Sequence, residues 1–352
     1  MSTLTTPITT MFGIKHPVVL AGMNAVAGPE LAAAVSNAGG LGIVGGVGYT
    51  PPMLRQILEE LVAKLATPDT KFGVDLLIPM VGDSARKTNT DYTKGQLPEL
   101  IDLVIEFKAS LFVCAVGVPP AWAVDKLHKA GIPVMNMIGS VKHVAKALAA
   151  GVDIICAQGS EGGGHTGAVS TSVLIPQVVD LCSKAIAPLT GGPVHVIAAG
   201  GIYDGRGLAM ALALGASAVW VGTRFICSQE ASAPKRLQQA VLKATSEDTV
   251  RSTIYTGRPL RILATPYVTN FEEYNRDKIR DAQKTGKVAV ATDFEEMQNK
   301  GEDISIEAKY PLLMGQAAGA VHKILPAKQI IEEMVEQAIG ILQRNVGYIS
   351  KI

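Results

Sequence analysis

The stretch that decides the fold is Val152-Asp153-Ile154-Ile155-Cys156-Ala157, which runs directly into Gln158-Gly159-Ser160-Glu161-Gly162-Gly163-Gly164-His165-Thr166-Gly167. Continuous rather than alternating hydrophobicity is typical of a strand that is buried on both faces. The loop after it has almost no side chains and presents one imidazole, that of His165. Glycines let a backbone approach a ligand closely, and a histidine at such a place can move a proton near neutral pH. A flexible turn with an incidental surface histidine is the alternative interpretation.

Seven further apolar runs share the character of this one, which makes eight in all. They are Val18–Met23, Leu41–Val47, Phe72–Ile78, Leu111–Val116, Pro133–Ile138, Val194–Ile202 and Ala218–Phe225, and the run quoted above extends over Asp153–Gly159. Because all eight read as strands buried on both faces, we expect one parallel sheet.

Helical patterns lie between these runs, and several of them end at a glycine, where a helix C-cap is expected. Examples are Gly28–Ala38, Pro51–Leu65, Pro119–Ala130, Val141–Ala150 and Gly205–Leu214. Eight strand–helix units predict an α/β fold of the (β/α)₈ TIM-barrel type. The alternative, an open doubly wound sheet, usually has fewer strands and a GxGxxG fingerprint after the first, and Gly22-Met23-Asn24 is no such fingerprint.

The character of the chain changes after Phe225. From about residue 231 to 300 it becomes charged and helical in pattern, and it also contains Tyr255-Thr256-Gly257-Arg258-Pro259-Leu260-Arg261. We therefore predict a barrel over residues 1–230, a helical excursion at the barrel mouth over 231–300, and C-terminal helices over 301–352 that pack back on the barrel.

The composition excludes several classes of protein. The chain has 352 residues, of which 48% are hydrophobic, and a formal net charge of +1. Near-neutral charge without a basic cluster argues against a nucleic-acid or membrane-surface partner. No apolar stretch approaches the roughly 20 residues of a membrane span, and no N-terminal stretch has the pattern of a secretory signal. We expect a cytoplasmic protein with reduced, buried cysteines, which are Cys114, Cys156, Cys182 and Cys227.

The last three residues suggest a second location. Ser350-Lys351-Ile352 nearly matches the Ser-Lys-Leu terminus that directs proteins to peroxisomes, although the final residue is not the standard one. A chance polar tail is the alternative.

Two neighbouring strand ends have features of a phosphate site. They read Ala198-Ala199-Gly200-Gly201-Ile202 and Val221-Gly222-Thr223-Arg224. Function in a barrel collects at the C-terminal ends of the strands, and a phosphate site commonly forms after strands seven and eight. Exposed backbone amides and helix N-termini bind phosphate. The alternative is that these glycines serve only close helix–strand packing.

No motif for a protein-based nucleophile or metal is present. The six histidines are dispersed without metal-ligand spacing, and no GxSxG follows a strand. The difficult chemistry is therefore expected to come from a bound cofactor, and the phosphate loops fit FMN.

Over essentially all of its length the chain resembles the nitronate monooxygenase family, formerly called 2-nitropropane dioxygenases. The stretches that carry the resemblance are Pro17–Met23, Ala38–Gly42, Phe72–Asp75, Gln158–His165, Ala199–Gly207, Val221–Phe225, Thr256–Pro259 and Gly315-Gln316. Together they are specific for FMN-binding barrels and less specific for the reaction.

The resemblance implies a set of roles. His165 would be the base that deprotonates a neutral nitroalkane, or the group that fixes an anionic nitronate. The other residues would bind FMN: Ala21, Gly22 and Met23 under the ring; Asp75, Gln158, Gly163, Gly164 and Gln316 around it; and Ala199, Gly200, Gly201, Gly222 and Thr223 at its phosphate.

The implied activity is oxidation of an alkyl nitronate with O₂ to a carbonyl compound and nitrite. Two other functions stay open: an NAD(P)H-dependent FMN reductase of quinones or enoyl thioesters, and a flavin-binding protein without turnover. No metal, nucleic acid or membrane partner is implied, and a homodimer is compatible with this interpretation.

Three positions depart from the pattern of the family. Asp75 stands where many relatives have Asn, and a carboxylate there would oppose a reduced, anionic flavin unless it is protonated or turned away. Met137 lies where some quinone-reducing relatives have Lys, and Trp220 stands where Gln is common. All three put the substrate, rather than the cofactor, in question.

Four further polar residues have weaker signals. Asp204, before a glycine, is expected to be a turn residue, with Tyr203 beside it. Arg258 is either a ligand of a carboxylate or nitro group or a solvated surface arginine. His195 precedes a buried strand and is expected to be structural.

Overall fold

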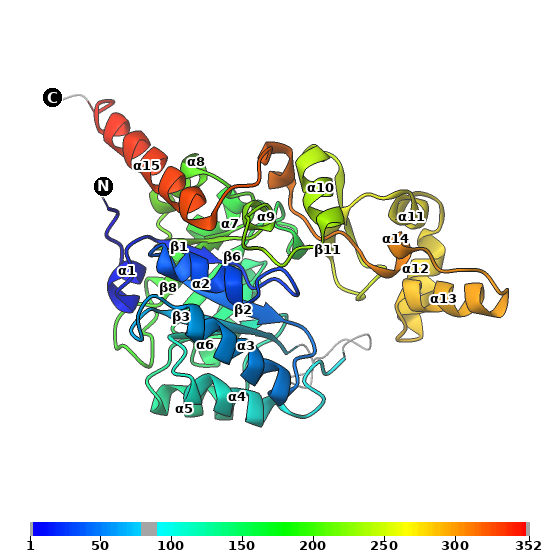
Figure 1. Cartoon of the computed structure of the whole chain (residues 1–352), viewed down its shortest axis with the longest axis horizontal. Helices are drawn as coiled ribbons and strands as arrows, with labels where there is room; N and C mark the ends of the chain where they lie inside the picture. The colour runs from blue at the N-terminus through cyan, green and yellow to red at the C-terminus, as the bar shows by residue number, and fades with distance from the viewer. Residues whose placement is uncertain (1–2, 79–89, 350–352) are drawn as a thin grey trace.

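The computed structural model describes residues 3–78 and 90–349 (Figure 1). Eight parallel strands form one sheet in the order β1-β9-β8-β6-β5-β4-β3-β2. A parallel bridge between Val19 and Leu41 joins the two ends of this sheet, so the barrel closes. The strands are β1 Val18–Leu20, β2 Gly42–Gly46, β3 Phe72–Leu77, β4 Leu111–Ala115, β5 Val134–Ile138, β6 Ile154–Gln158, β8 His195–Ala199 and β9 Ala218–Val221. The predicted TIM barrel and its eight strands are confirmed.

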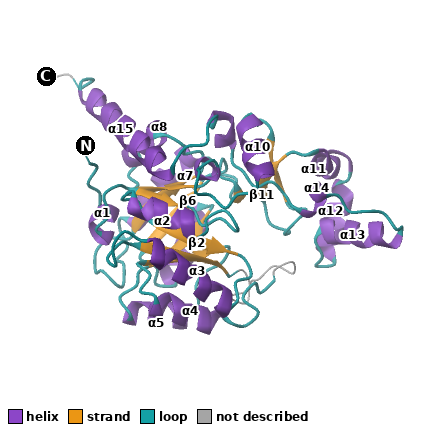
Figure 2. Ribbon diagram, viewed as in Figure 1, coloured by secondary structure: helices purple, strands orange, loops and turns teal. Residues whose placement is uncertain are grey.

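Helices surround this sheet (Figure 2). They are α2 Pro29–Asn37, α3 Pro51–Lys64, α4 Leu97–Glu106, α5 Ala121–Lys129, η1 Val141–His143, α6 Val144–Ala149, α7 Thr171–Cys182, α8 Gly205–Ala213 and α9 Thr223–Ile226. Before the barrel, α1 (Pro7–Phe12) places Ile8 and Phe12 in the apolar cluster inside it, so this helix plugs one end. After the excursion, α15 (Ala327–Val346) packs against α8 and α2.

Side chains alternate between the inside of the barrel and its helical coat. On β3, for example, Val74 and Leu76 pack in the outer core, whereas Asp75 between them does not. The inner core contains residues such as Val19, Ile43, Val113, Met135 and Ile197. The four cysteines are buried and free, as expected.

The segment after β9 differs in part from the expected helical excursion. Its elements are α10 Lys235–Lys243, β10 Thr249–Ser252, β11 Leu260–Leu263, α11 Pro266–Thr269, the π-helix η2 Asn270–Tyr274, α12 Arg276–Lys284, α13 Ala289–Asn299, α14 Ile306–Lys309 and η3 Gln316–Ala320. The helices are present, and α11 to α14 project to one side of the barrel (Figure 1). The expectation omitted a hairpin.

In that hairpin, β10 and β11 pair with each other, and β11 pairs antiparallel with β7 (Gly164–His165) of the glycine-rich loop. The register places Leu260 opposite His165 and Arg261 opposite Gly164. The excursion is therefore tied by backbone pairing to the loop that carries the candidate base.

No helix in residues 3–78 and 90–349 is long and apolar enough to cross a bilayer. Ser350-Lys351-Ile352 lies outside the described residues.

Candidate active site at the barrel mouth

The ends of β1, β2 and β3 meet so closely that glycine is required at two of them. A Cβ on Gly22 would overlap Asp75 Oδ2 and lie only 2.8 Å from its Cγ. A Cβ on Gly45 would lie 2.9 Å from the carbonyl carbon of Gly22. The neighbouring end of β9 is also near, since a Cβ on Gly222 would lie 3.3 Å from Ala21 Cβ and 3.6 Å from Met23 Sδ. On this side of the mouth, the surface therefore consists mostly of backbone atoms, and few side chains project from it.

Asp75 is the polar group in this surface. It is 2% exposed, and its Oδ1 has no hydrogen-bond partner among the described residues. Burial raises the pKa of its carboxyl to about 8. Because desolvation disfavours the charged form, the group is predominantly protonated at pH 7.

Opposite this surface, Gln158 at the end of β6 holds the glycine-rich loop. Its side-chain amide donates to the carbonyl of His165 at 2.8 Å and to that of Gly163 at 3.3 Å. The loop is in turn covered by Gly315 and the first residue of η3. Gln316 N–H donates to Glu161 O at 3.0 Å, and a Cβ on Gly163 would lie 2.7 Å from Gly315 N. The glycines here let two backbones touch.

Two charged side chains lock the same loop. The Glu161 carboxylate accepts from the Thr171 backbone N–H at 3.0 Å and from its hydroxyl at 3.1 Å. Arg261 of β11 is 8% exposed and donates from Nε to Ser160 O at 2.7 Å and from Nη1 to Thr249 Oγ1 at 2.8 Å. The loop is therefore fixed to α7 on one side and to the hairpin on the other.

His165 sits in this fixed loop with a defined ring orientation. Its Nε2 lies 3.1 Å from Thr256 Oγ1. Burial lowers the pKa of its imidazole to about 4, and the positive charge of Arg258 contributes to this shift. The ring is therefore neutral at pH 7. A neutral ring can accept a proton or a hydrogen bond, and Arg258 supplies the positive charge nearby.

The predicted phosphate residues lie at the ends of β8 and β9. Gly200 and Gly201 both have left-handed backbone, with φ of 99° and 71°, where a side chain would be strained. A Cβ on Gly201 would also lie 3.2 Å from Glu161 Cβ, so close packing accounts for part of the glycine requirement. Thr223 accepts the Gly315 N–H at 2.9 Å through its hydroxyl oxygen, and that hydroxyl can still donate to an anion.

All the predicted site residues therefore lie at one end of the barrel, at the C-terminal ends of β1, β3, β6, β8 and β9 and in the segment over them. Trp220 belongs to the inner core, with Met137 packed against it. The positive charge of Arg258 acts to lower the pKa of His165, Tyr92 and His143, so this charge lies near all three groups at the mouth. Asp204 caps α8 by accepting from Arg206 N at 3.0 Å, so the turn interpretation holds.

Sequence reasoning missed Arg261, Glu161 and Thr256. A signal for the first was present, because Leu260-Arg261-Ile262-Leu263 follows a Gly-Arg-Pro turn and reads as a short strand. No signal in the sequence indicated that this strand pairs with Gly164 and His165, almost one hundred residues earlier.

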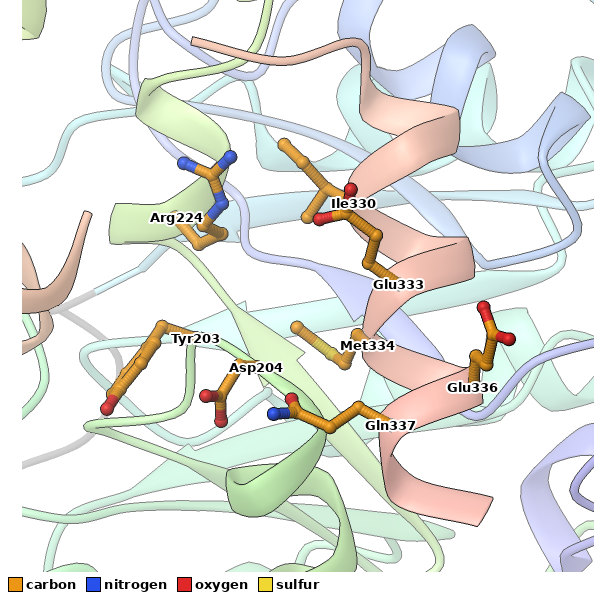
Figure 3. Close-up of a pocket in the computed structure, with 8 residues that line it drawn as sticks. All are labelled: Tyr203, Asp204, Arg224, Ile330, Glu333, Met334, Glu336 and Gln337. Atoms are coloured by element: carbon orange, nitrogen blue, oxygen red, sulfur yellow. The ribbon is translucent and has the colours of Figure 1, made fainter. Parts of the chain in front are cut away.

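A separate cavity of about 460 Å³ lies outside the mouth, between the loop before α8, α9 and α15 (Figure 3). Two of its polar groups are engaged within the protein: Arg224 Nη1 donates to Lys323 O at 2.9 Å, and Asp204 caps α8. It contains none of the predicted cofactor residues. Within the described ranges no group of three or more His, Cys, Asp or Glu side chains could hold a metal ion.

Comparison with known proteins assigns the barrel to a family. The profile of the family "Nitronate monooxygenase" matches residues 5–337. The chain belongs to the nitronate monooxygenase family. The resemblance stated from the sequence is therefore confirmed, and the chain is an oxidoreductase of a family of flavoenzymes.

Individual relatives carry different names. The chain is 39% identical to (3aS,4S,5R,7aS)-5-hydroxy-7a-methyl-1-oxo-octahydro-1H-indene-4-carboxyl-CoA dehydrogenase of Rhodococcus jostii (strain RHA1), over 77% of this chain and 69% of that protein. It is 31% identical to a "Probable nitronate monooxygenase" of Staphylococcus saprophyticus, over 97% and 99% of the two chains. Among solved structures, FabK from Thermotoga maritima has a TM-score of 0.76 at 32% identity and covers 99% of this chain and 100% of its own.

Proposed function

We propose that the protein is an FMN-dependent nitronate monooxygenase, which oxidises alkyl nitronates, and nitroalkanes after deprotonation, with O₂ to a carbonyl compound and nitrite. The observation that carries the proposal is the neutral imidazole of His165, held by Thr256 at the barrel mouth beside the positive charge of Arg258. A neutral imidazole can accept an α-proton, and a cation next to it stabilises the anion that results.

The residues at the mouth fit a flat cofactor with a phosphate. Gly22 and Gly45 leave a backbone surface, and the unpartnered Asp75 Oδ1 offers a polar contact. Ala21 and Met23 would lie under the ring, with Gln158, Gly163, Gly164 and Gln316 at its edge. Gly200, Gly201, Gly222 and Thr223 would hold the phosphate, next to Ala199. When bound, FMN supplies the electron transfer that no side chain here can perform.

The remaining work falls to the chain itself. His165 takes the α-proton of a neutral nitroalkane, while Gln158 fixes the backbone on which His165 sits. Arg258 attracts the nitronate. Tight packing of the β6 loop under Gly315 and Gln316 keeps these groups in place.

The test is turnover by a His165→Asn variant. It should retain FMN and oxidise a preformed nitronate, but oxidise the neutral nitroalkane about 10²-fold more slowly, which is the usual scale for a lost general base. His143→Asn makes the same chemical change at a second histidine close to Arg258 and should change neither rate by more than about twofold. Unchanged nitrite release from the neutral substrate in His165→Asn would remove His165 from the role of base.

A second candidate is favoured by the name of the Rhodococcus relative, a dehydrogenase of a CoA thioester. The α-proton of a thioester needs the same kind of base as that of a nitroalkane, and His165 would supply it. In the reducing direction, with electrons from NAD(P)H, this chemistry is that of an NAD(P)H-dependent FMN reductase of enoyl thioesters or quinones, which is the second candidate. Bleaching of the bound flavin by NADPH, without a response to nitronate, would select it.

Three further proposals concern organisation. We propose the division into a barrel (1–230), an excursion (231–300) and a C-terminal part (301–352), a location in the cytoplasm or the peroxisome, and assembly as a homodimer. Size-exclusion chromatography with light scattering tests the last, and fluorescence microscopy with and without the final tripeptide tests the location.

A further inference from the structure

The carboxyl group of Asp75 is buried, and one of its oxygens is without a hydrogen-bond partner among residues 3–78 and 90–349, which is unusual for an acidic side chain. It lies inside the barrel near its mouth and is 2% exposed. Gly22 packs directly against Oδ2, and Oδ1 has no hydrogen-bond partner in the described part of the chain. An unpaired buried polar group costs free energy, and natural proteins keep few of them.

The titratable groups that interact electrostatically with Asp75 provide no counter-charge. They are Tyr49, after β2, the thiol of Cys156 on β6, and the thiol of Cys114, which lies on the outer face of β4. Burial raises the pKa of Tyr49 to about 12 and raises the pKa of both thiols, so all three are neutral between pH 7 and 9. Without a cation nearby, the low-dielectric surroundings favour the protonated carboxyl, and burial places its pKa at about 8.

A protonated carboxyl is a hydrogen-bond donor, and this one has an open direction. The side chain points into the barrel, because its neighbours Val74 and Leu76 point to the helical coat. Gly22 and Gly45 remove the side chains that would otherwise stand between Asp75 and the mouth. Buried polar groups are normally hydrogen-bonded. An acid that is buried without a partner, and that stabilises nothing around it, is typical of a functional position.

We propose that Asp75 is held neutral so that its O–H donates a hydrogen bond to the flavin ring, and that FMN binds only the protonated form. This inference rests on the proposed FMN site. It assigns to Asp75 a role that a carboxylate cannot fill, since a negative charge at this depth would repel the ring when it is reduced and anionic. The proton stays on Asp75 throughout binding.

The test is the affinity of the apoprotein for FMN as a function of pH, measured by quenching of flavin fluorescence. If only the protonated form binds, a carboxyl with a pKa of about 8 weakens the apparent Kd about tenfold between pH 7 and pH 9. Asp75→Asn keeps a donor that cannot ionise, so its Kd should change less than twofold over the same range. Tyr49→Phe, the control for the neighbouring phenol, should keep the tenfold dependence.

Equal pH profiles for wild type and Asp75→Asn would overturn this inference and leave the FMN site intact. Failure of FMN to bind the wild-type apoprotein at any pH would overturn the cofactor site, and this inference with it. Urea unfolding of the wild-type apoprotein gives a second readout if the variant does not fold. The folded state keeps a proton on Asp75 that the unfolded chain releases near pH 4, so Asp75 makes stability fall as pH rises through its pKa of about 8. The buried histidines have the opposite effect only up to about pH 7, so stability should fall between pH 7 and 9 and level off above that. A flat profile there would show that Asp75 is ionised.

Discussion

Substitution of Gly22 by Ala tests the packing on which the barrel mouth depends. The new Cβ would overlap Asp75 Oδ2 and lie 2.7 Å from its Cβ and 2.8 Å from its Cγ, where carbon atoms normally approach to about 3.5–4.0 Å. Asp75 cannot retreat easily, because its backbone pairs with Gly45 on one side and with Val113 on the other. We expect a loss of about 3 kcal/mol in the free energy of unfolding, at the upper end of the cost of overpacking.

The substitution acts through one neighbour, which makes a double-mutant cycle decisive. All three of the closest atoms belong to Asp75, and Gly22 does not have a left-handed backbone conformation that would strain alanine. In an Asp75→Gly background the cost of Gly22→Ala should therefore fall below about 1 kcal/mol, a coupling of about 2 kcal/mol, within the range for residues in contact.

Urea unfolding of the four apoproteins at pH 7 measures this coupling. Gly340→Ala is the matched control: Gly340 lies within α15 with no atom within 4 Å of a new Cβ, so the substitution should stabilise the protein by up to about 1 kcal/mol. A coupling energy under about 0.5 kcal/mol would refute the close contact between β1 and β3.

Two further predictions concern the β6 loop. Since burial lowers the pKa of His165 to about 4, below its unfolded value of about 6.5, the unfolded chain alone binds a proton between these values. The unfolding free energy of wild type minus that of His165→Asn should rise from pH 4 to 6.5 and stay constant above, and urea titrations showing no such rise would contradict the burial. Arg261→Met removes the bonds to Ser160 and Thr249 and should cost about 3 kcal/mol in urea unfolding, whereas Arg280→Met, on the exposed face of α12, should cost under about 0.5 kcal/mol. Equal effects of the two arginine substitutions would show that Arg261 does not fix the loop.

The barrel was predictable because a strand that is buried on both faces has a continuous apolar sequence. Continuous apolar runs such as Ile154–Ala157 are typical of strands inside a parallel sheet, and the glycines that follow them mark the strand ends. The hairpin was not predictable in the same way. Thr249–Ser252 is short and lies in a charged segment, and the third strand of its sheet is β7, in a loop far away in the chain.

The sequence indicated which residues form the candidate site, but it did not indicate their protonation states. His165 stands out in a loop of glycines, but its low pKa depends on burial and on Arg258, which the fold brings to it. Asp75 shows the same limit. The sequence raises the question of its charge, and the answer that it is protonated comes from its burial among neutral groups, which only the fold reveals.

The most direct test of the account is the visible spectrum of the purified, anaerobic protein after reconstitution with FMN, recorded before and after addition of a nitronate and, separately, of NADPH. The proposed function predicts a flavin spectrum that changes with nitronate and not with NADPH. Bleaching by NADPH alone would contradict it and assign the protein as a reductase, and absence of flavin absorbance after reconstitution would contradict the cofactor site itself.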